Sequence, residues 1–325
     1  METNSKVLLE AKNLVKEFPV LSAKKKNACV HAVSDVSLTI YEGETLALVG
    51  ESGCGKSTLG RLLLRLIELT GGELLLEGEN LTAMTAKELI SVRKKMQIIF
   101  QDPYASLNPR MTVEQIIGEP LLTHKIFRTK EEKHQRIIEL LGKVGIPKEA
   151  LKRYPHQFSG GQRQRIGIAR AIALNPKLVI CDEPVSALDV SIQSQVLNLL
   201  HDLQEEYRLT YLFISHDLSV VRHIASRVCV MFLGKICEIG DADEIFKSPK
   251  HPYTKFLLEA VPRPNPELRK ENKQLLTGEM PSPLSPPSGC RFHTRCPYAT
   301  ELCENTEPVM TDMGNIQVAC HYPLV

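Results

Sequence analysis

The chain has 325 residues, of which 43% are hydrophobic and 24% charged, as in an ordinary soluble globular protein with one large domain and an appendage, or with two domains. A formal net charge of +2 argues against a nucleic-acid-binding surface spread over the whole molecule. The sequence predicts neither a membrane-spanning segment nor a signal-peptide core, so we expect a cytosolic protein whose nine cysteines are reduced or ligate a metal.

The N-terminal part of the chain alternates apolar and polar residues. This pattern predicts strands over residues 7–18 and 29–40, with a loop over 19–28 between them. Phe18 could stack on a purine base or form a half-buried strand end, and the pattern does not decide between the two.

Residues 50–58 fit the phosphate-binding loop pattern Gly-x-x-x-x-Gly-Lys-Ser/Thr. A predicted strand over 44–49 precedes them and a predicted helix over 58–67 follows. Glycines let backbone N–H groups turn toward phosphate oxygens, and the helix N-terminus adds a positive dipole. Lys56 can then reach the β- and γ-phosphates, and the Ser57 hydroxyl can hold Mg²⁺. The sequence therefore predicts nucleoside triphosphate binding by Gly50, Glu51, Ser52, Gly53, Cys54, Gly55, Lys56, Ser57 and Thr58.

The residue pattern in the middle of the chain changes after a predicted buried strand over residues 96–101. Prolines then punctuate helical runs such as 130–144, which predicts an inserted helical subdomain over about 102–165. Near its end, Ser159 is a plausible N-cap, and Gly160 and Gly161 open the backbone for a second phosphate-facing helix start.

Two later strands deliver polar residues at their carboxyl ends, where open α/β sheets bind ligands. The apolar strand 177–183 ends in Asp182, which fits a Mg²⁺ ligand, and Glu183, which can reach a water aimed at the γ-phosphate. The alternative for both acids is a solvated strand end. His216 follows a buried strand over 211–215; such a lone histidine is usually structural, but here it ends a strand aimed at the same site.

Together these stretches resemble the ATP-binding cassette family, the ATPase subunits of ABC transporters, over roughly residues 7–260. The resemblance implies an α/β P-loop ATPase with a RecA-like core sheet, an N-terminal antiparallel β subdomain and the helical insertion. It also implies Mg²⁺ held by Ser57, Gln101 and Asp182, and catalysis by Glu183, His216, Gln101 and Lys56. The further nucleotide contacts implied are the adenine-stacking Phe18, the signature residues Ser159, Gly160, Gly161 and Gln162, and the D-loop Asp189.

Residues 100–110 and 251–254 look like the peptide and nickel importer branch of that family. Such ATPases work as dimers, because the signature of one subunit completes the ATP site of another. The resemblance implies a second, related ATPase chain, two integral membrane permease subunits and an external substrate-binding protein, with this chain peripheral on the cytoplasmic face of the membrane. We expect import of di- or oligopeptides and no nucleic-acid partner.

Two alternatives stay open at this point. One is the same importer class carrying nickel or another small solute. The other is a soluble ABC ATPase acting on ribosomes or DNA, although that type usually carries two cassettes or a long coiled coil, and this chain has one phosphate loop and no sustained heptads. A kinase or GTPase would not explain residues 159–162.

The end of the chain is rich in proline and cysteine. We predict an ATPase domain over residues 1–261, a linker over 262–287 that holds seven of the 20 prolines, and a metal-binding tail over 288–325. Cysteine spacing alone leaves zinc, an iron–sulfur cluster and unligated thiols open. Resemblance to dipeptide-type importer ATPases favours a [4Fe–4S] cluster over zinc, held by Cys290, Cys296, Cys303 and Cys320.

Overall fold

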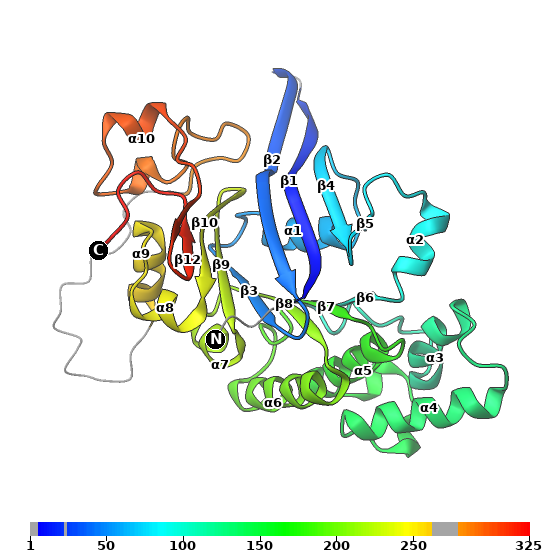
Figure 1. Cartoon of the computed structure of the whole chain (residues 1–325). Coiled ribbons are helices and arrows are strands. Elements are labelled where there is room, and N and C mark those ends of the chain that lie inside the picture. Colours follow the sequence, from blue (N-terminus) through cyan, green and yellow to red (C-terminus); the bar gives the residue numbers. More distant parts are fainter. Residues whose placement is uncertain (1–5, 23–24, 262–278) are drawn as a thin grey trace, which may run out of the picture. The chain divides into compact units, whose positions relative to one another are not determined.

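The computed structural model of the chain describes residues 6–22, 25–261 and 279–325, coloured along the sequence in Figure 1. Most of the predicted linker, residues 262–278, lies outside the described residues. The chain divides into two compact units, Met1–Ala83 with Ser215–Val325 and Met84–Ile214, and each is described by itself.

The first unit begins with an antiparallel sheet of order β2-β1-β4-β5. Strands β1 (Val7–Ser22) and β2 (Lys25–Tyr41) form a long hairpin, with β4 (Gly71–Leu76) beside β1 and β5 (Glu79–Asn80) beyond it. The predicted loop over 19–28 is wrong where residues are described, because the pairing continues through Phe18 with Val30 and Val20 with Ala28.

The same unit contains a mixed sheet fragment built on β3 (Thr45–Val49), whose five residues are all buried as in a central parallel strand. Strand β9 (Arg227–Phe232) pairs parallel to β3, and β10 (Lys235–Asp241), β12 (Ile316–Val318) and β11 (Thr311–Met313) follow in antiparallel order. Among the described residues, the helices of this unit are α1 (Lys56–Leu63), α7 (Leu218–Ile224), α8 (Ala242–Lys247), α9 (Pro252–Ala260), the 3₁₀ helix η4 (His293–Arg295) and α10 (Glu301–Asn305).

The C-terminal segment shares the core of the first unit. Phe292 is 1% exposed, and its ring centre lies 5.3 Å from those of both Phe232 and Tyr253. Ile316 joins the same buried cluster, and β12 pairs with β10, as Figure 1 shows. The structure therefore does not support a separate Cys-rich extension, because aromatic packing and strand pairing merge these residues into the unit.

The second unit contains three parallel strands, β6 (Met96–Ile99), β7 (Leu178–Asp182) and β8 (Thr210–Ser215), paired in that order. Its helices pack α3 against α4 and both against α5, and their buried residues include Ile117, Leu140 and Ile168. Its helical elements are α2 (Ala86–Val92), α3 (Val113–Thr123), α4 (Lys130–Lys143), η1 (Lys148–Ala150), η2 (Pro155–Gln157), α5 (Gly160–Ile172) and α6 (Val190–Tyr207). The α/β class and the antiparallel N-terminal sheet are confirmed.

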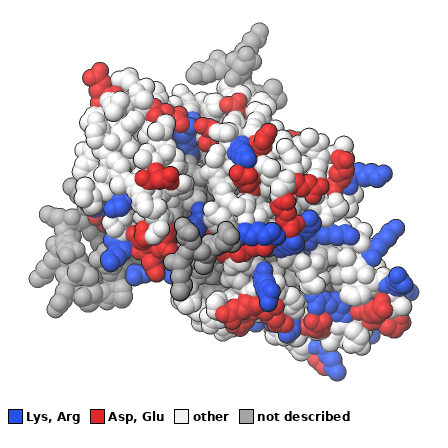
Figure 2. Space-filling model, in the orientation of Figure 1, with Lys and Arg blue, Asp and Glu red and all other residues white. Residues whose placement is uncertain are grey.

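Acidic and basic side chains intermingle on the face of the molecule drawn in Figure 2, in line with the near-balanced net charge. Among the described residues, none of the helices combines the length and apolar character needed to cross a bilayer.

Candidate functional site

The predicted phosphate-binding loop connects β3 to α1 in the first unit. Gly55, the residue before the helix, has φ of +109°, and a Cβ there would lie 2.2 Å from the backbone oxygen of Ala32. At Gly50 a Cβ would lie 2.1 Å from the oxygen of Met231. Both positions therefore require glycine, and the loop passes closer to neighbouring backbone than any side chain allows.

The loop has the properties of an anion cradle. Helix α1 starts without a side-chain cap hydrogen bond, and its N-terminus carries the positive end of the helix dipole. Lys56 is only 5% exposed, and its Nζ donates to the backbone oxygens of Gly50 at 2.8 Å and Glu51 at 2.9 Å. This held ammonium, the uncapped helix end and the glycine backbone fit a triphosphate. Ser57 and Thr58 are half-buried, while Ser52 and Gly53 are exposed.

Two further predicted residues lie in the same unit. His216 is exposed and directly follows β8, just before Asp217 caps α7 by accepting from the Ser219 N–H at 2.8 Å. Phe18 is 37% exposed on β1, and the Nζ of Lys16 lies 4.9 Å from its ring centre.

The second unit carries the predicted carboxylates. Asp182 ends β7 and is 4% exposed. Glu183 follows with φ of +46°, a conformation that non-glycine residues seldom adopt and that concentrates at functional sites. Its N–H donates to the oxygen of Ile214 at 3.0 Å, and its carboxylate accepts from Gln101 Nε2 at 2.8 Å. The structure thus brings together Gln101 and Glu183, which lie 82 residues apart in the sequence.

The predicted signature forms the start of α5. Ser159 is the N-cap: its Oγ accepts from the Gln162 N–H at 3.3 Å, and the Gln162 side chain accepts from the Ser159 N–H at 3.1 Å. A Cβ at Gly161 would lie 2.6 Å from Ile192 of α6, whereas Gly160 is less crowded. Asp189, the N-cap residue of α6, is exposed and makes no side-chain cap bond.

The four C-terminal cysteines line one small apolar cavity of about 10 Å³, together with Phe292 and Tyr298. The predicted [4Fe–4S] cluster is wrong: in the parts of the chain that the structure describes, three or more His, Cys, Asp or Glu side chains nowhere converge as metal ligands. The cysteines instead face an apolar space with room for about one water molecule. Burial also raises the pKa of Cys320 to about 11, so its thiol stays protonated at neutral pH.

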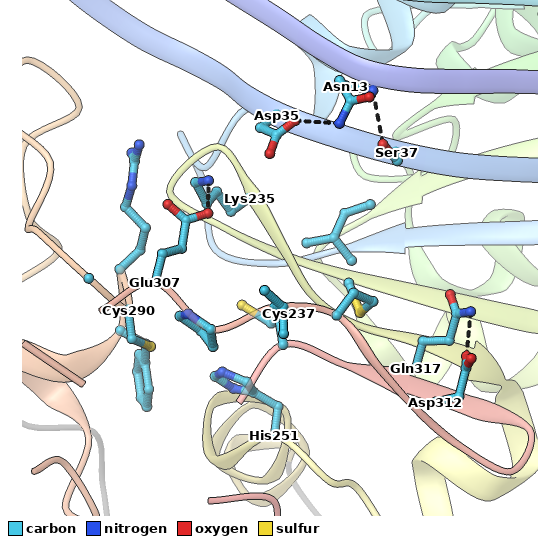
Figure 3. Close-up of a pocket in the computed structure, with 18 residues that line it drawn as sticks. Asn13, Asp35, Ser37, Lys235, Cys237, His251, Cys290, Glu307, Asp312 and Gln317 are labelled. Carbon is cyan, nitrogen blue, oxygen red and sulfur yellow. Dashed lines mark hydrogen bonds and ion pairs between the residues drawn. The ribbon is translucent and has the colours of Figure 1, made fainter. Parts of the chain in front are cut away.

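A larger hollow of about 560 Å³ lies in the first unit between the β1–β2 hairpin and the C-terminal segment. Figure 3 shows that its polar residues pair with one another: Lys235 with Glu307, Asn13 with Asp35, and Gln317 with Asp312. None of the predicted ATP-site residues belongs to its lining.

Glu51 has two hydrogen-bonding partners from distant parts of the chain that the sequence did not predict. Tyr253 of α9 accepts from the Glu51 N–H at 2.9 Å, and Arg295 of η4 binds the Glu51 carboxylate at 2.9 Å. These partners lie 202 and 244 residues away, so no spacing rule could have found them. Tyr253 lies in the stretch 251–254 that resembles importer ATPases, but the resemblance indicated no role for it.

Comparison with known proteins agrees with this architecture. Residues 33–186 match the ABC transporter family model, and residues 237–303 match the model of the oligopeptide/dipeptide transporter C-terminal region. A solved dimeric ATP-binding cassette in a post-hydrolysis state with ADP and phosphate is similar with a TM-score of 0.64 and 30% identity, covering 72% of this chain and 99% of that one. The fold and the phosphate-binding loop thus define an ABC-type ATPase.

Relatives narrow the assignment. The chain is 52% identical to the oligopeptide transport ATP-binding protein AppF of Bacillus subtilis over 98% of each chain. It is 51% identical to the dipeptide transport ATP-binding protein DppF of Escherichia coli, over 96% of this chain and 93% of that one. The chain belongs to the family of oligopeptide and dipeptide transport ATP-binding proteins.

Proposed function

We propose that this chain is the ATP-hydrolysing subunit of an ABC importer for di- and oligopeptides. The observation that carries the proposal is full-length similarity to peptide transport ATP-binding proteins, including the C-terminal region that marks this branch. AppF and DppF are both named for peptide transport. These names favour peptides over nickel as the transported solute, and they favour a transport ATPase over an ATPase that acts on ribosomes or DNA.

The residues divide the chemistry between them. The phosphate-binding loop holds the triphosphate, and Lys56 and His216 stabilise negative charge that develops at the γ-phosphate. Glu183 orients or deprotonates the attacking water, and Gln101, which donates to its carboxylate, helps to hold it in position. The oxygen donors of Ser57, Asp182 and Gln101 suit Mg²⁺, which when bound would supply positive charge at phosphate oxygens.

The partners follow from this role. Two integral membrane permease subunits carry the solute, an external binding protein selects it, and a second, related ATPase chain completes the pair. The chain then works peripherally on the cytoplasmic face of the membrane. We further propose that residues 288–325 belong to the cassette itself, with Phe292 and β12 built into the core and sheet of the first unit.

Peptide uptake by whole cells tests the transported class. We expect that cells lacking this chain take up labelled di- and oligopeptides at a small fraction of the parental rate, while uptake of nickel and free amino acids is unchanged. The chain should also co-purify from membranes with integral subunits. Loss of nickel uptake alone, or a chain recovered only with ribosomes, would contradict the proposal.

A charge introduced at the signature tests the shared ATP site. Ser159→Asp keeps an N-cap oxygen for the Gln162 N–H, so α5 still forms, but it places an anion where the partner's γ-phosphate binds. We expect ATP binding by the purified chain to be unchanged and turnover of the assembled transporter to fall roughly 100-fold.

The matched control is Thr112→Asp, because Thr112 caps α3 in the same kind of box with Gln115. Its turnover should equal that of the wild type. A monomeric preparation that hydrolyses ATP at the full rate with Ser159→Asp would refute the shared site.

A further inference from the structure

The C-terminal segment contacts the phosphate-binding loop directly at Glu51. Nη1 of Arg295 donates to both carboxylate oxygens of Glu51, at 2.9 and 3.1 Å. The Arg295 side chain is 8% exposed and the Glu51 side chain 26% exposed. The pair is therefore shielded from solvent, and its attraction is screened less than that of a surface ion pair.

Arg295 is itself held in place by the core of the first unit. Its guanidinium carbon lies 5.9 Å from the ring centre of Phe232, and its Nε is buried without a hydrogen-bond partner. Three residues earlier, Phe292 packs against Phe232, Tyr253 and Phe256. A buried donor without a partner is costly, and the ion pair with Glu51 offsets part of the cost of burying this guanidinium.

Glu51 is fixed at its backbone as well. The Tyr253 hydroxyl accepts from its N–H at 2.9 Å, and Lys56 Nζ donates to its carbonyl oxygen at 2.9 Å. The N–H, the carbonyl and the carboxylate of one loop residue therefore all have partners, two of them on elements after residue 250. The C-terminal region therefore contacts the loop at its second position, through Tyr253 and Arg295.

Because Glu51 is negatively charged, its ion pair with Arg295 affects how the loop binds ATP. A triphosphate is strongly anionic, and a carboxylate within the loop that binds it repels it unless a cation compensates. Lys56 cannot serve both, because its ammonium is required at the phosphates. We propose that Arg295 is a positioning residue for nucleotide binding: it neutralises Glu51 and holds the loop in the conformation that accepts ATP.

A purely structural role would look different. If Arg295 only fastened the C-terminal segment through Glu51, its loss would lower the unfolding midpoint but leave the Kd for ATP of the folded chain unchanged. If it compensates the charge of Glu51, removing that charge should restore ATP binding. The inference rests on the ATP binding contained in the proposed function, but not on which solute is transported.

The experiment measures the Kd for ATP of the full-length purified chain by titration, with the unfolding midpoint recorded alongside. Arg295→Met is expected to raise the Kd roughly tenfold or more, the effect of losing a charge-assisted hydrogen bond at the loop. Arg295→Met combined with Glu51→Gln should recover most of this loss and bind ATP within about threefold of Glu51→Gln alone, which is the reference for the double variant. Arg295→Lys keeps the charge but not the planar donor geometry, so its Kd for ATP should lie between those of the wild type and Arg295→Met.

Lys255→Met is the matched control, since it removes a partly exposed cation of α9 that pairs with Glu259, and it should leave the Kd unchanged. A Kd within twofold of the wild type for Arg295→Met overturns the inference. So does a double variant as weak as Arg295→Met. If Arg295→Met does not fold, Arg295→Lys with and without Glu51→Gln carries the same comparison. A wild-type chain that does not bind ATP would instead refute the proposed function.

Discussion

Replacing Glu183 with glutamine is expected to lower ATP turnover of the assembled transporter by roughly 100-fold or more, while ATP binding stays intact. Glutamine has the same shape, and its side-chain oxygen can still accept from Gln101 Nε2. It cannot take a proton from water, so the attacking nucleophile is no longer activated. The rate of phosphate release and the affinity for ATP, measured on the same preparation, separate the two effects.

The control for this change is Glu139→Gln on α4, an exposed glutamate that pairs with Arg136. It makes the same chemical change in the same unit and should leave turnover at the wild-type value. If Glu183→Gln hydrolyses ATP within about threefold of the wild-type rate, another residue activates the water. The positive φ of Glu183 would then need a different explanation.

Replacing Gly55 with alanine is expected to abolish ATP binding and to lower the free energy of unfolding by roughly 3 kcal/mol. The new Cβ would lie 2.2 Å from the backbone oxygen of Ala32, so either β2 or the start of α1 must move. Movement of α1 would also displace Lys56, the residue that follows. Chemical denaturation and ATP titration measure the two effects.

Gly43→Ala is the control that shows the effect of backbone strain without a collision like that between a Cβ at Gly55 and Ala32. Gly43 also has a positive φ, +80°, but a Cβ there has no heavy atom within 4 Å. We expect a loss of about 1 kcal/mol and unchanged ATP affinity. Equal losses for both variants would mean that the approach of Ala32 does not constrain the loop.

The C-terminal segment packs in the same core as the strand before the predicted phosphate-binding loop and contacts that loop. Its aromatic residue Phe292 belongs to the same core as β3 and β9, and Arg295 reaches the phosphate-binding loop. If Arg295 positions the loop as proposed, this segment stabilises the part of the first unit that would bind phosphate. We expect substitutions in the C-terminal segment to change the affinity for nucleotide more than they change the position of Gln101 and Glu183.

Local signals in the sequence were sufficient to predict the separate parts of the site. The glycines of the loop 50–58 and the buried strand before it follow from residue types and short-range periodicity, and α4 begins at Lys130 as predicted because Thr129 caps it. The helix after the loop was predicted over residues 58–67, but α1 runs from Lys56 to Leu63 and so begins within the phosphate-binding pattern. The carboxylates at the end of β7 were found for the same reason. Each signal lies within a few residues of the element that it defines.

The contacts that join distant segments depend on the folded chain. Whether Gln101 would meet Glu183, whether Arg295 would meet Glu51, and whether the cysteines would converge on a metal or on an apolar cavity depend on strand pairing and aromatic packing across the chain. Sequence spacing fixes neighbours three or four residues apart on a helix and two apart on a strand. It carries no information about which side chains the folded core brings within 3 Å across 244 residues.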